Sequence, residues 1–156
     1  MDLKQLYQDI ILEHGKSPRN LGKCEGYSHD AKGYNPLCGD KVHVYLKLNK
    51  EKKVEGLTFE GEGCAISLAS ASIMTELVKG KSFIEAKEIM GEFLKMIKNT
   101  SDIKSNYLDE DQKIKLMSLS GVKQFPMRVK CATLSWHTLF SAIEGNIKEI
   151  NTETTD

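Results

Sequence analysis

The sequence predicts an α+β fold in which a small antiparallel sheet of three strands carries its helices on one face. Strand-like alternation of polar and apolar residues is concentrated between residues 41 and 60, and helix-like periodicity dominates the chain after it. A run of hairpin strands followed by a run of helices is typical of α+β proteins. The 156 residues fit one domain. We therefore expect a single domain over residues 1–150 and a polar tail over residues 151–156.

The first element is expected to be a helix over about residues 2–14. Its apolar residues recur at helical spacing, and Asp2 can cap its N-terminus. Residues 15–40 hold five of the twelve glycines and two of the three prolines, which favours irregular structure there. We expect only a short strand near Tyr27, and an exposed loop over residues 33–40.

Two alternating segments, residues 41–48 and residues 54–60, predict a β-hairpin. In the first segment the apolar residues occupy every second position, so that one face is apolar and the other polar. The polar run at residues 49–53 is typical of the turn between them. With the short strand near Tyr27, the hairpin gives the expected sheet of three strands.

Helices are expected over most of the remaining chain. Residues 64–78 are small or apolar and contain no proline, which favours a largely buried helix. Ser82 and Glu85 have the spacing of a capping box, and an amphipathic pattern follows them. We expect a short helix near residues 111–117, and Pro126 is suited to the first turn of a last helix.

Charge and hydropathy exclude several classes of partner. The chain has 22 basic and 22 acidic residues, so its formal net charge is zero, whereas nucleic-acid-binding domains are usually strongly basic. The most apolar stretch, residues 65–74, is about half the ~20 residues that a membrane span needs. The N-terminal residues do not have the pattern of a signal peptide. We expect no nucleic acid partner, no membrane partner and a cytoplasmic location.

Four cysteines, Cys24, Cys38, Cys64 and Cys131, are too few and too widely spaced for a disulfide scaffold. Cys38 and Asp40 precede the first hairpin strand, and Cys64 follows the second. Residues that flank the open end of an antiparallel hairpin are neighbours, so these three should lie close together. Cys131, near the start of the last helix, could join them, whereas Cys24 lies outside this convergence.

Three thiolates and one carboxylate suit a tetrahedral Zn²⁺ site, with a net charge of −2 that nearby cations would offset. Arg128 and Lys130 flank Cys131 and could supply that positive charge. The residues alone leave a second interpretation open, because a cysteine in an apolar helix commonly packs as a small hydrophobic side chain.

Four segments carry a resemblance to a known family: Tyr7–Asn20, Asn35–Asp40, Phe59–Ser67 and Arg128–Trp136. In these motifs and their order the chain resembles the IscU/NifU-N/SufU family of iron–sulfur cluster assembly proteins, from residue 3 to about residue 145. The long connection between Cys64 and Cys131 is similar to the SufU branch, as is Lys130 before the last cysteine.

The resemblance implies an IscU/SufU-like fold and a zinc site made by Cys38, Asp40, Cys64 and Cys131. It also implies a SufS-like cysteine desulfurase as partner, with Cys38 matching the residue that accepts persulfide sulfur. The protein would then be a zinc-dependent sulfurtransferase that supplies downstream SUF assembly proteins or apo iron–sulfur proteins. The alternative is a scaffold that holds iron or assembles a [2Fe–2S] cluster on the same cysteines. A purely structural zinc domain is a third interpretation.

Overall fold

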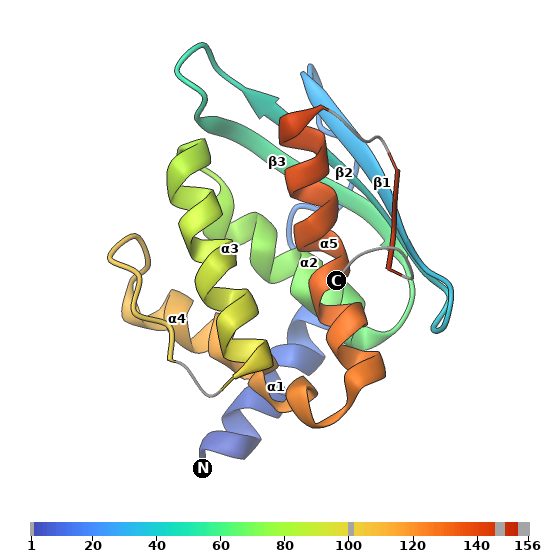
Figure 1. The fold of residues 1–156 in the computed structure, drawn as a ribbon, viewed down its shortest axis with the longest axis vertical. Coiled ribbons are helices and arrows are strands. Elements are labelled where there is room, and N and C mark those ends of the chain that lie inside the picture. The colour runs from blue at the N-terminus through green and yellow to red at the C-terminus, as the bar shows by residue number, and fades with distance from the viewer. Residues whose placement is uncertain (1, 100–101, 146–148, 153–156) are drawn as a thin grey trace.

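The computed structural model describes residues 2–99, 102–145 and 149–152 (Figure 1). Its helices and strands, in chain order, are α1 (Leu3–Lys16), β1 (His29–Asn35), β2 (Asp40–Leu48), β3 (Val54–Glu62), α2 (Ala65–Val78), α3 (Phe83–Lys98), α4 (Glu110–Met117), the 3₁₀ helix η1 (Ser118–Gln124), α5 (Pro126–Glu144) and β4 (Glu149–Asn151).

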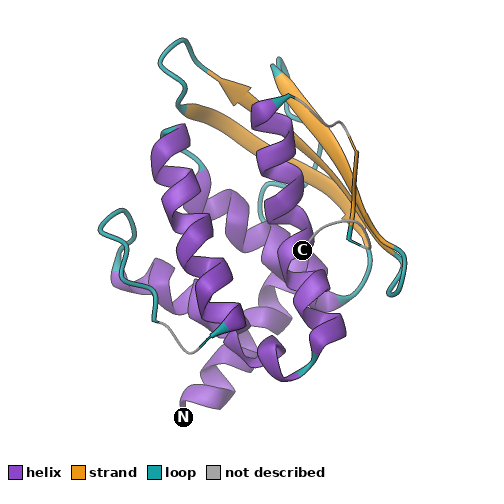
Figure 2. Cartoon of the chain, viewed as in Figure 1, coloured by secondary structure: helices purple, strands orange, loops and turns teal. Residues whose placement is uncertain are grey.

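The sheet has the strand order β3-β2-β1-β4. β1, β2 and β3 pair in antiparallel fashion, and the short β4 pairs with β1 in parallel. The helices gather on one side of this sheet, with α2 and α5 packed directly against it (Figure 2). The predicted α+β fold, with three antiparallel strands and helices on one face, is therefore confirmed, and β4 is an addition to it.

Local sequence signals account for several boundaries. The Asp2 carboxylate accepts a hydrogen bond from the Gln5 N–H at 2.8 Å and so caps α1. Ser82 and Glu85 form the predicted capping box before α3, and Pro126 begins α5. Tertiary packing then fixes the helices on the sheet, because their apolar faces and the inner face of the sheet enclose one hydrophobic core.

The segment before β2 differs from the prediction. The exposed loop expected over residues 33–40 is confirmed only for the turn at residues 36–39, because residues 33–35 complete β1 and Asp40 already belongs to β2. β1 also begins at His29, beyond the predicted position near Tyr27. At Gly33 the strand lies so close to α5 that a Cβ atom would collide with the Thr138 hydroxyl. Contact with a distant helix therefore holds a segment of weak strand propensity in the sheet.

The C-terminal residues also differ from the expected tail over residues 151–156. Asn151 is part of β4, and Thr152 is buried with its N–H donating to the Tyr34 carbonyl at 2.9 Å. Residues 153–156 lie outside the described residues. Among the described helices, none combines the length and the apolar character that a membrane crossing requires.

His14 is a buried polar residue that joins α1 to α2. Its Nδ1 lies 2.7 Å from the Ser72 hydroxyl, which also accepts a hydrogen bond from the Arg19 N–H at 2.8 Å. The other ring nitrogen lies 3.5 Å from a carboxylate oxygen of Glu76. Burial of the ring, together with the nearby Arg19 charge, lowers the pKa of His14 below its usual value.

We expect the protein to lose stability below about pH 6.5 in a way that depends on His14. An unfolded histidine has a pKa of about 6.5, so at lower pH the unfolded chain binds a proton that the folded chain binds less readily. The free energy of unfolding therefore falls as the pH drops from about 6.5 toward the lowered folded pKa. Urea midpoints at about pH 7.5 and about pH 5.5 should differ less for His14→Asn than for the unmodified protein. His29→Asn is the control, and equal pH sensitivity in all three proteins would contradict the prediction.

Candidate metal centre

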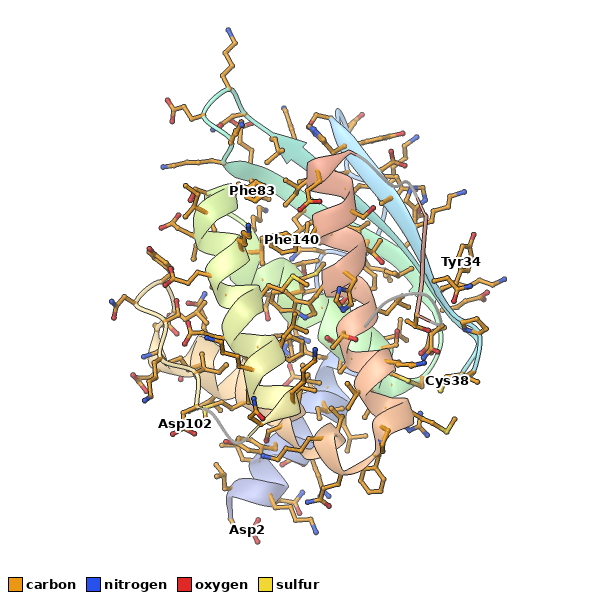
Figure 3. The ribbon with its side chains drawn as sticks, in the orientation of Figure 1. Asp2, Tyr34, Cys38, Phe83, Asp102 and Phe140 are labelled. Atoms are coloured by element: carbon orange, nitrogen blue, oxygen red, sulfur yellow. The ribbon has the colours of Figure 1, made fainter. Side chains whose placement is uncertain are left out.

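The four predicted ligands come from three parts of the chain that meet at one end of the sheet. Cys38 lies in the turn between β1 and β2, and Asp40 is the first residue of β2. Cys64 lies two residues after the end of β3 and is the N-cap residue of α2. Cys131 lies in the second turn of α5, and Figure 3 shows Cys38 beside the first part of that helix.

Three of these residues form a close group. The Cys38 sulfur, a carboxylate oxygen of Asp40 and the Cys131 sulfur all lie within 4.8 Å of one another. The Cys64 sulfur borders the group, 4.0 Å from Asp40 Oδ2. In a tetrahedral zinc site with Zn–S bonds of about 2.3 Å, ligand sulfurs are about 3.7 Å apart. Cys38, Asp40 and Cys131 therefore lie close to that spacing, and Cys64 would complete the set by moving toward them.

The hairpin register places Asp40 beside Cys64. Lys41 pairs with Glu62, so the next residues along β3 reach the start of β2. Gly63 has a φ of 149°, and a Cβ atom there would collide with the Asp40 carboxylate, so glycine is required at this position. The Cys64 N–H then donates to Asp40 Oδ1 at 2.9 Å. This geometry confirms the predicted proximity of Asp40 and Cys64, two of the three residues expected to meet at the open end of the hairpin.

Two of the candidate ligands are buried and two are partly exposed to solvent. Asp40 and Cys131 are 1% and 0% exposed, respectively, whereas Cys38 and Cys64 are partly exposed. Packing as a small hydrophobic side chain does not fully describe Cys131, because its sulfur faces two thiols and a carboxylate as well as apolar side chains.

Cys64 and Cys131 shift each other's pKa in opposite directions. Hydrogen bonds from the Cys131 thiol and from the Ser67 N–H lower the pKa of Cys64 to about 6. The Cys64 sulfur, together with burial, raises the pKa of Cys131 well above its usual value. The thiolates in turn raise the pKa of Arg128, whose guanidinium bonds to Cys131. Arg128, one of the two cations predicted to flank Cys131, therefore lies beside the thiols.

The donor set fits a divalent metal ion. A buried carboxylate next to three thiols concentrates negative charge once the thiols ionise, and a bound cation would neutralise that charge. Thiolates with one carboxylate suit zinc by ligand type, and thiolates also suit iron–sulfur clusters. The metal would be held by the thiolates of Cys38, Cys64 and Cys131 and by the carboxylate of Asp40.

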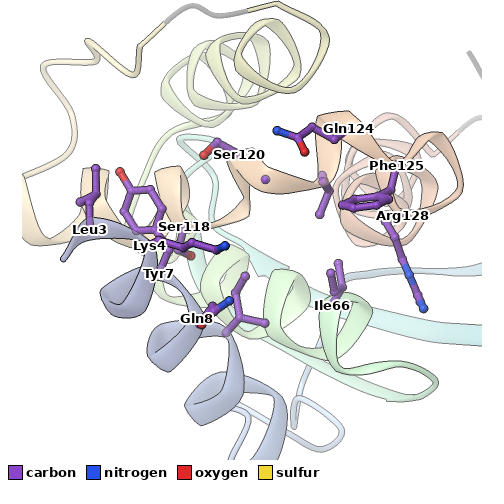
Figure 4. A pocket seen from close by; sticks show the side chains of 13 residues that line it. Leu3, Lys4, Tyr7, Gln8, Ile66, Ser118, Ser120, Gln124, Phe125 and Arg128 are labelled. Carbon is purple, nitrogen blue, oxygen red and sulfur yellow. The ribbon is translucent and has the colours of Figure 1, made fainter. Parts of the chain in front are cut away.

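A hollow of about 610 Å³ opens beside Cys38 and is lined by Ile66 and by residues 124–128. It adjoins a groove of about 680 Å³ between α1, η1 and the start of α5. Figure 4 shows the groove, with Phe125 and Arg128 at one end and Leu3 and Tyr7 at the other. The metal centre therefore has a partly apolar approach on the side of Cys38.

Two residues near the centre were not identified from the sequence. Asn35 was part of a recognised motif but received no role, although its side-chain amide contacts both Asp40 and Cys131. Thr152 lies in the segment expected to be a tail, so no sequence signal connects it to the centre.

Cys24 lies apart from the centre, with its sulfur next to Gly56 of β3, as expected for a residue outside the convergence.

Comparison with known proteins agrees with this architecture. The sequence profile of the NifU-like N-terminal domain matches residues 6–132. The chain is 41% identical over 138 residues to the zinc-dependent sulfurtransferase SufU of Bacillus subtilis, covering 88% of this chain and 89% of that protein. It is 37% identical over 142 residues to the iron–sulfur cluster assembly scaffold protein IscU of Streptococcus pyogenes, covering 91% of this chain and 85% of that protein.

A solved structure has the same fold. It is a putative iron–sulfur cluster assembly scaffold protein for the SUF system from Fervidobacterium islandicum, with a TM-score of 0.77 and 34% identity. The match covers 89% of this chain and 97% of that structure. The profile match and the near full-length relatives together show that the chain belongs to the IscU/NifU-N family of NifU-like N-terminal domains.

Proposed function

We propose that this protein acts in iron–sulfur cluster assembly as a zinc-dependent acceptor of sulfur, and that Cys38 takes the sulfur from the persulfide of a cysteine desulfurase. The observation that carries the proposal is the position of Cys38. It is a candidate metal ligand on a turn, it is partly exposed, and it faces the 610 Å³ hollow. The relative named as a zinc-dependent sulfurtransferase supports the same conclusion.

The anchoring of the ligands is unequal. Cys64 is held at the N-terminus of α2, where its sulfur accepts a hydrogen bond from the Ser67 N–H at 3.4 Å. Cys131 is held within α5 and is fully buried. Cys38 is held by a short turn, through a backbone hydrogen bond from its N–H to the Asn35 carbonyl at 3.3 Å. A turn can move a side chain at lower cost than a packed helix, so Cys38 is the ligand suited to leave the centre.

The proposed transfer is a thiol exchange. The Cys38 thiolate attacks the outer sulfur of the donor persulfide, the donor's S–S bond breaks, and the donor cysteine leaves as a thiolate. Cys38 then carries the persulfide, so atoms and electrons balance without an added oxidant. Bound zinc would supply the positive charge that keeps the thiols ionised near neutral pH. Asp40, Cys64 and Cys131 would remain in place and keep the centre assembled during the exchange.

The partner of this step would be a SufS-like cysteine desulfurase. The hollow beside Cys38 and the adjoining groove give a partner access from one side. The exposed apolar side chains of Phe125 and Met127 line the hollow, that of Leu37 directly precedes Cys38 in the turn, and all three are suited to contact a protein partner. Persulfide sulfur would pass from Cys38 to downstream SUF assembly proteins or apo iron–sulfur proteins. The cytoplasmic location stays a prediction.

We expect the zinc-loaded protein to stimulate sulfide release from cysteine by the host's cysteine desulfurase in the presence of reductant. In Cys38→Ala the stimulation should disappear, because the nucleophile that accepts the sulfur is gone. Cys24→Ala is the matched control and should stimulate as the unmodified protein does, since Cys24 lies outside the centre. Full stimulation of sulfide release by the Cys38→Ala protein would contradict the proposal.

The scaffold alternative predicts a different result in the same assay. The scaffold names of two relatives, together with the suitability of the thiols for iron–sulfur clusters, favour it. A scaffold would bind the desulfurase without raising its rate, and would develop the absorption bands of a [2Fe–2S] cluster when iron and sulfide are supplied. Loss of those bands in Cys64→Ala and Cys131→Ala would then assign the cluster to the same site.

A further inference from the structure

Asn35 contacts three of the four candidate ligands. Its backbone carbonyl accepts a hydrogen bond from the Cys38 N–H at 3.3 Å. Its side-chain amide donates to Asp40 Oδ2 at 3.1 Å and to the Cys131 sulfur at 3.4 Å. The β-sheet register also pairs Asn35 directly with Asp40 across β1 and β2. One residue thus links the ligand on the turn, the ligand on β2 and the ligand on α5.

The chemistry of the ligands fixes the orientation of the Asn35 amide. Asp40 as a carboxylate and Cys131 as a metal-bound thiolate can only accept hydrogen bonds. The NH₂ group, with its two donors, must therefore face them, and the carbonyl oxygen must face the opposite way. Because Asn35 is 0% exposed, that oxygen needs a partner within the protein.

Thr152 supplies that partner. Its hydroxyl donates to Asn35 Oδ1 at 3.1 Å, and its own N–H donates to the Tyr34 carbonyl at 2.9 Å. Thr152 is 2% exposed and directly follows β4, whose Asn151 pairs with Tyr34 of β1. The segment after the C-terminal strand thereby brings a hydroxyl to the side-chain oxygen of Asn35, to which the ligands donate no hydrogen bond.

We propose that Asn35 is a positioning residue of the metal centre, and that Thr152 makes its orientation depend on the docking of the C-terminal strand. This inference rests on the metal site of the proposed function. By donating two hydrogen bonds to anionic ligands, Asn35 holds Asp40 and Cys131 toward the metal and offsets part of their negative charge. Such partners of metal ligands set ligand orientation and metal affinity. Detachment of the strand would leave a buried carbonyl without a donor and loosen both ligands.

The test measures zinc affinity by competition with a chromophoric chelator, alongside the thiolate-to-metal charge-transfer bands of the Co²⁺-substituted protein. Asn35→Ala should bind zinc about 10–100-fold more weakly than the unmodified protein and should show altered Co²⁺ bands. Asn35→Asp, which replaces the two donors by a carboxylate facing two anions, should bind at least as weakly. Circular dichroism of the zinc-free variants separates these effects from a loss of fold.

Two substitutions at Thr152 test the coupling to the C-terminal strand without altering the amide. Thr152→Val keeps the shape and removes the hydroxyl, so it should weaken zinc binding by about tenfold, the lower end of the range for such partners. Thr152→Ser keeps the hydroxyl and should restore the unmodified affinity. If the Asn35 variants fail to fold, the two Thr152 variants still test whether the orientation of the Asn35 amide affects zinc affinity.

The outcomes separate the two proposals. Zinc affinity and Co²⁺ bands in Asn35→Ala equal to those of the unmodified protein would overturn the positioning role. Equal affinity in Thr152→Val and Thr152→Ser would overturn the coupling to the strand. A wild-type protein that binds no zinc would instead remove the metal site of the proposed function itself.

Discussion

Removal of zinc by a chelator is expected to lower the melting temperature by about 8–16 °C without unfolding the chain at room temperature. A ligand present at a thousand times its dissociation constant stabilises a protein by about 4 kcal/mol, and each kcal/mol shifts the melting temperature of a chain of this size by about 2–4 °C. The chain should stay folded because its core is built from apolar side chains away from the centre. Among them are Trp136 and Phe93, whose ring centroids lie 5.0 Å apart.

Calorimetry or circular dichroism melts, with and without chelator, would measure this shift, and added zinc should reverse it. The control is Cys131→Ser, whose melting temperature should respond little to the chelator because it holds little zinc. If chelation instead removed the helical signal at room temperature, the metal would be an obligatory part of the fold. That result would favour the structural zinc domain over the sulfur acceptor.

Substitution of Cys131 is expected to damage metal binding far more than substitution of Cys38. In Cys38→Ser, water can reach the open position from the hollow, and a zinc ion with three protein ligands and one water is a common arrangement. In Cys131→Ser, the lost ligand is 0% exposed and is contacted by Asn35 and Arg128, so we expect that water does not readily take its place. Its zinc affinity should fall by more than the ~10–100-fold that removal of a ligand's hydrogen-bond partner costs.

The measurement is the zinc content per chain after gel filtration, supported by competition with a chelator. Cys38→Ser should retain zinc with reduced affinity, Cys131→Ser should lose it, and Cys24→Ser should match the unmodified protein. Equal losses in the Cys38 and Cys131 variants would mean that the two ligands are equivalent. The unequal anchoring on which the transfer mechanism depends would then be wrong.

Much of the fold was predictable because its signals are local. The alternation of β2 and β3, the cap of α1 and the capping box of α3 all depend on residues a few positions apart, and each is present in the structure. The proximity of Asp40 and Cys64 was predictable for a related reason, since the geometry of a hairpin follows from its two strands.

The missed elements depend on contacts between distant parts of the chain. β1 includes charged residues, a glycine and an asparagine, and it is held by pairing with β2 and by the close approach of α5 at Gly33. β4 has three residues and pairs in parallel with a strand more than one hundred residues earlier in the chain. Thr152 reaches the centre through that pairing, and the Asn35 amide reaches Cys131 because α5 packs against β1, so neither contact follows from a local pattern.

The spread of the ligands along the chain has a consequence for the order of events during synthesis. Cys38, Asp40 and Cys64 belong to the hairpin region, whereas Cys131 is carried by α5, the last helix of the described chain. A nascent chain that has not yet emerged to α5 offers an incomplete ligand set, so a four-ligand centre cannot guide early folding. Metal uptake should then report that synthesis and docking of the last helix are finished, and the kinetics of zinc incorporation would follow those of tertiary folding.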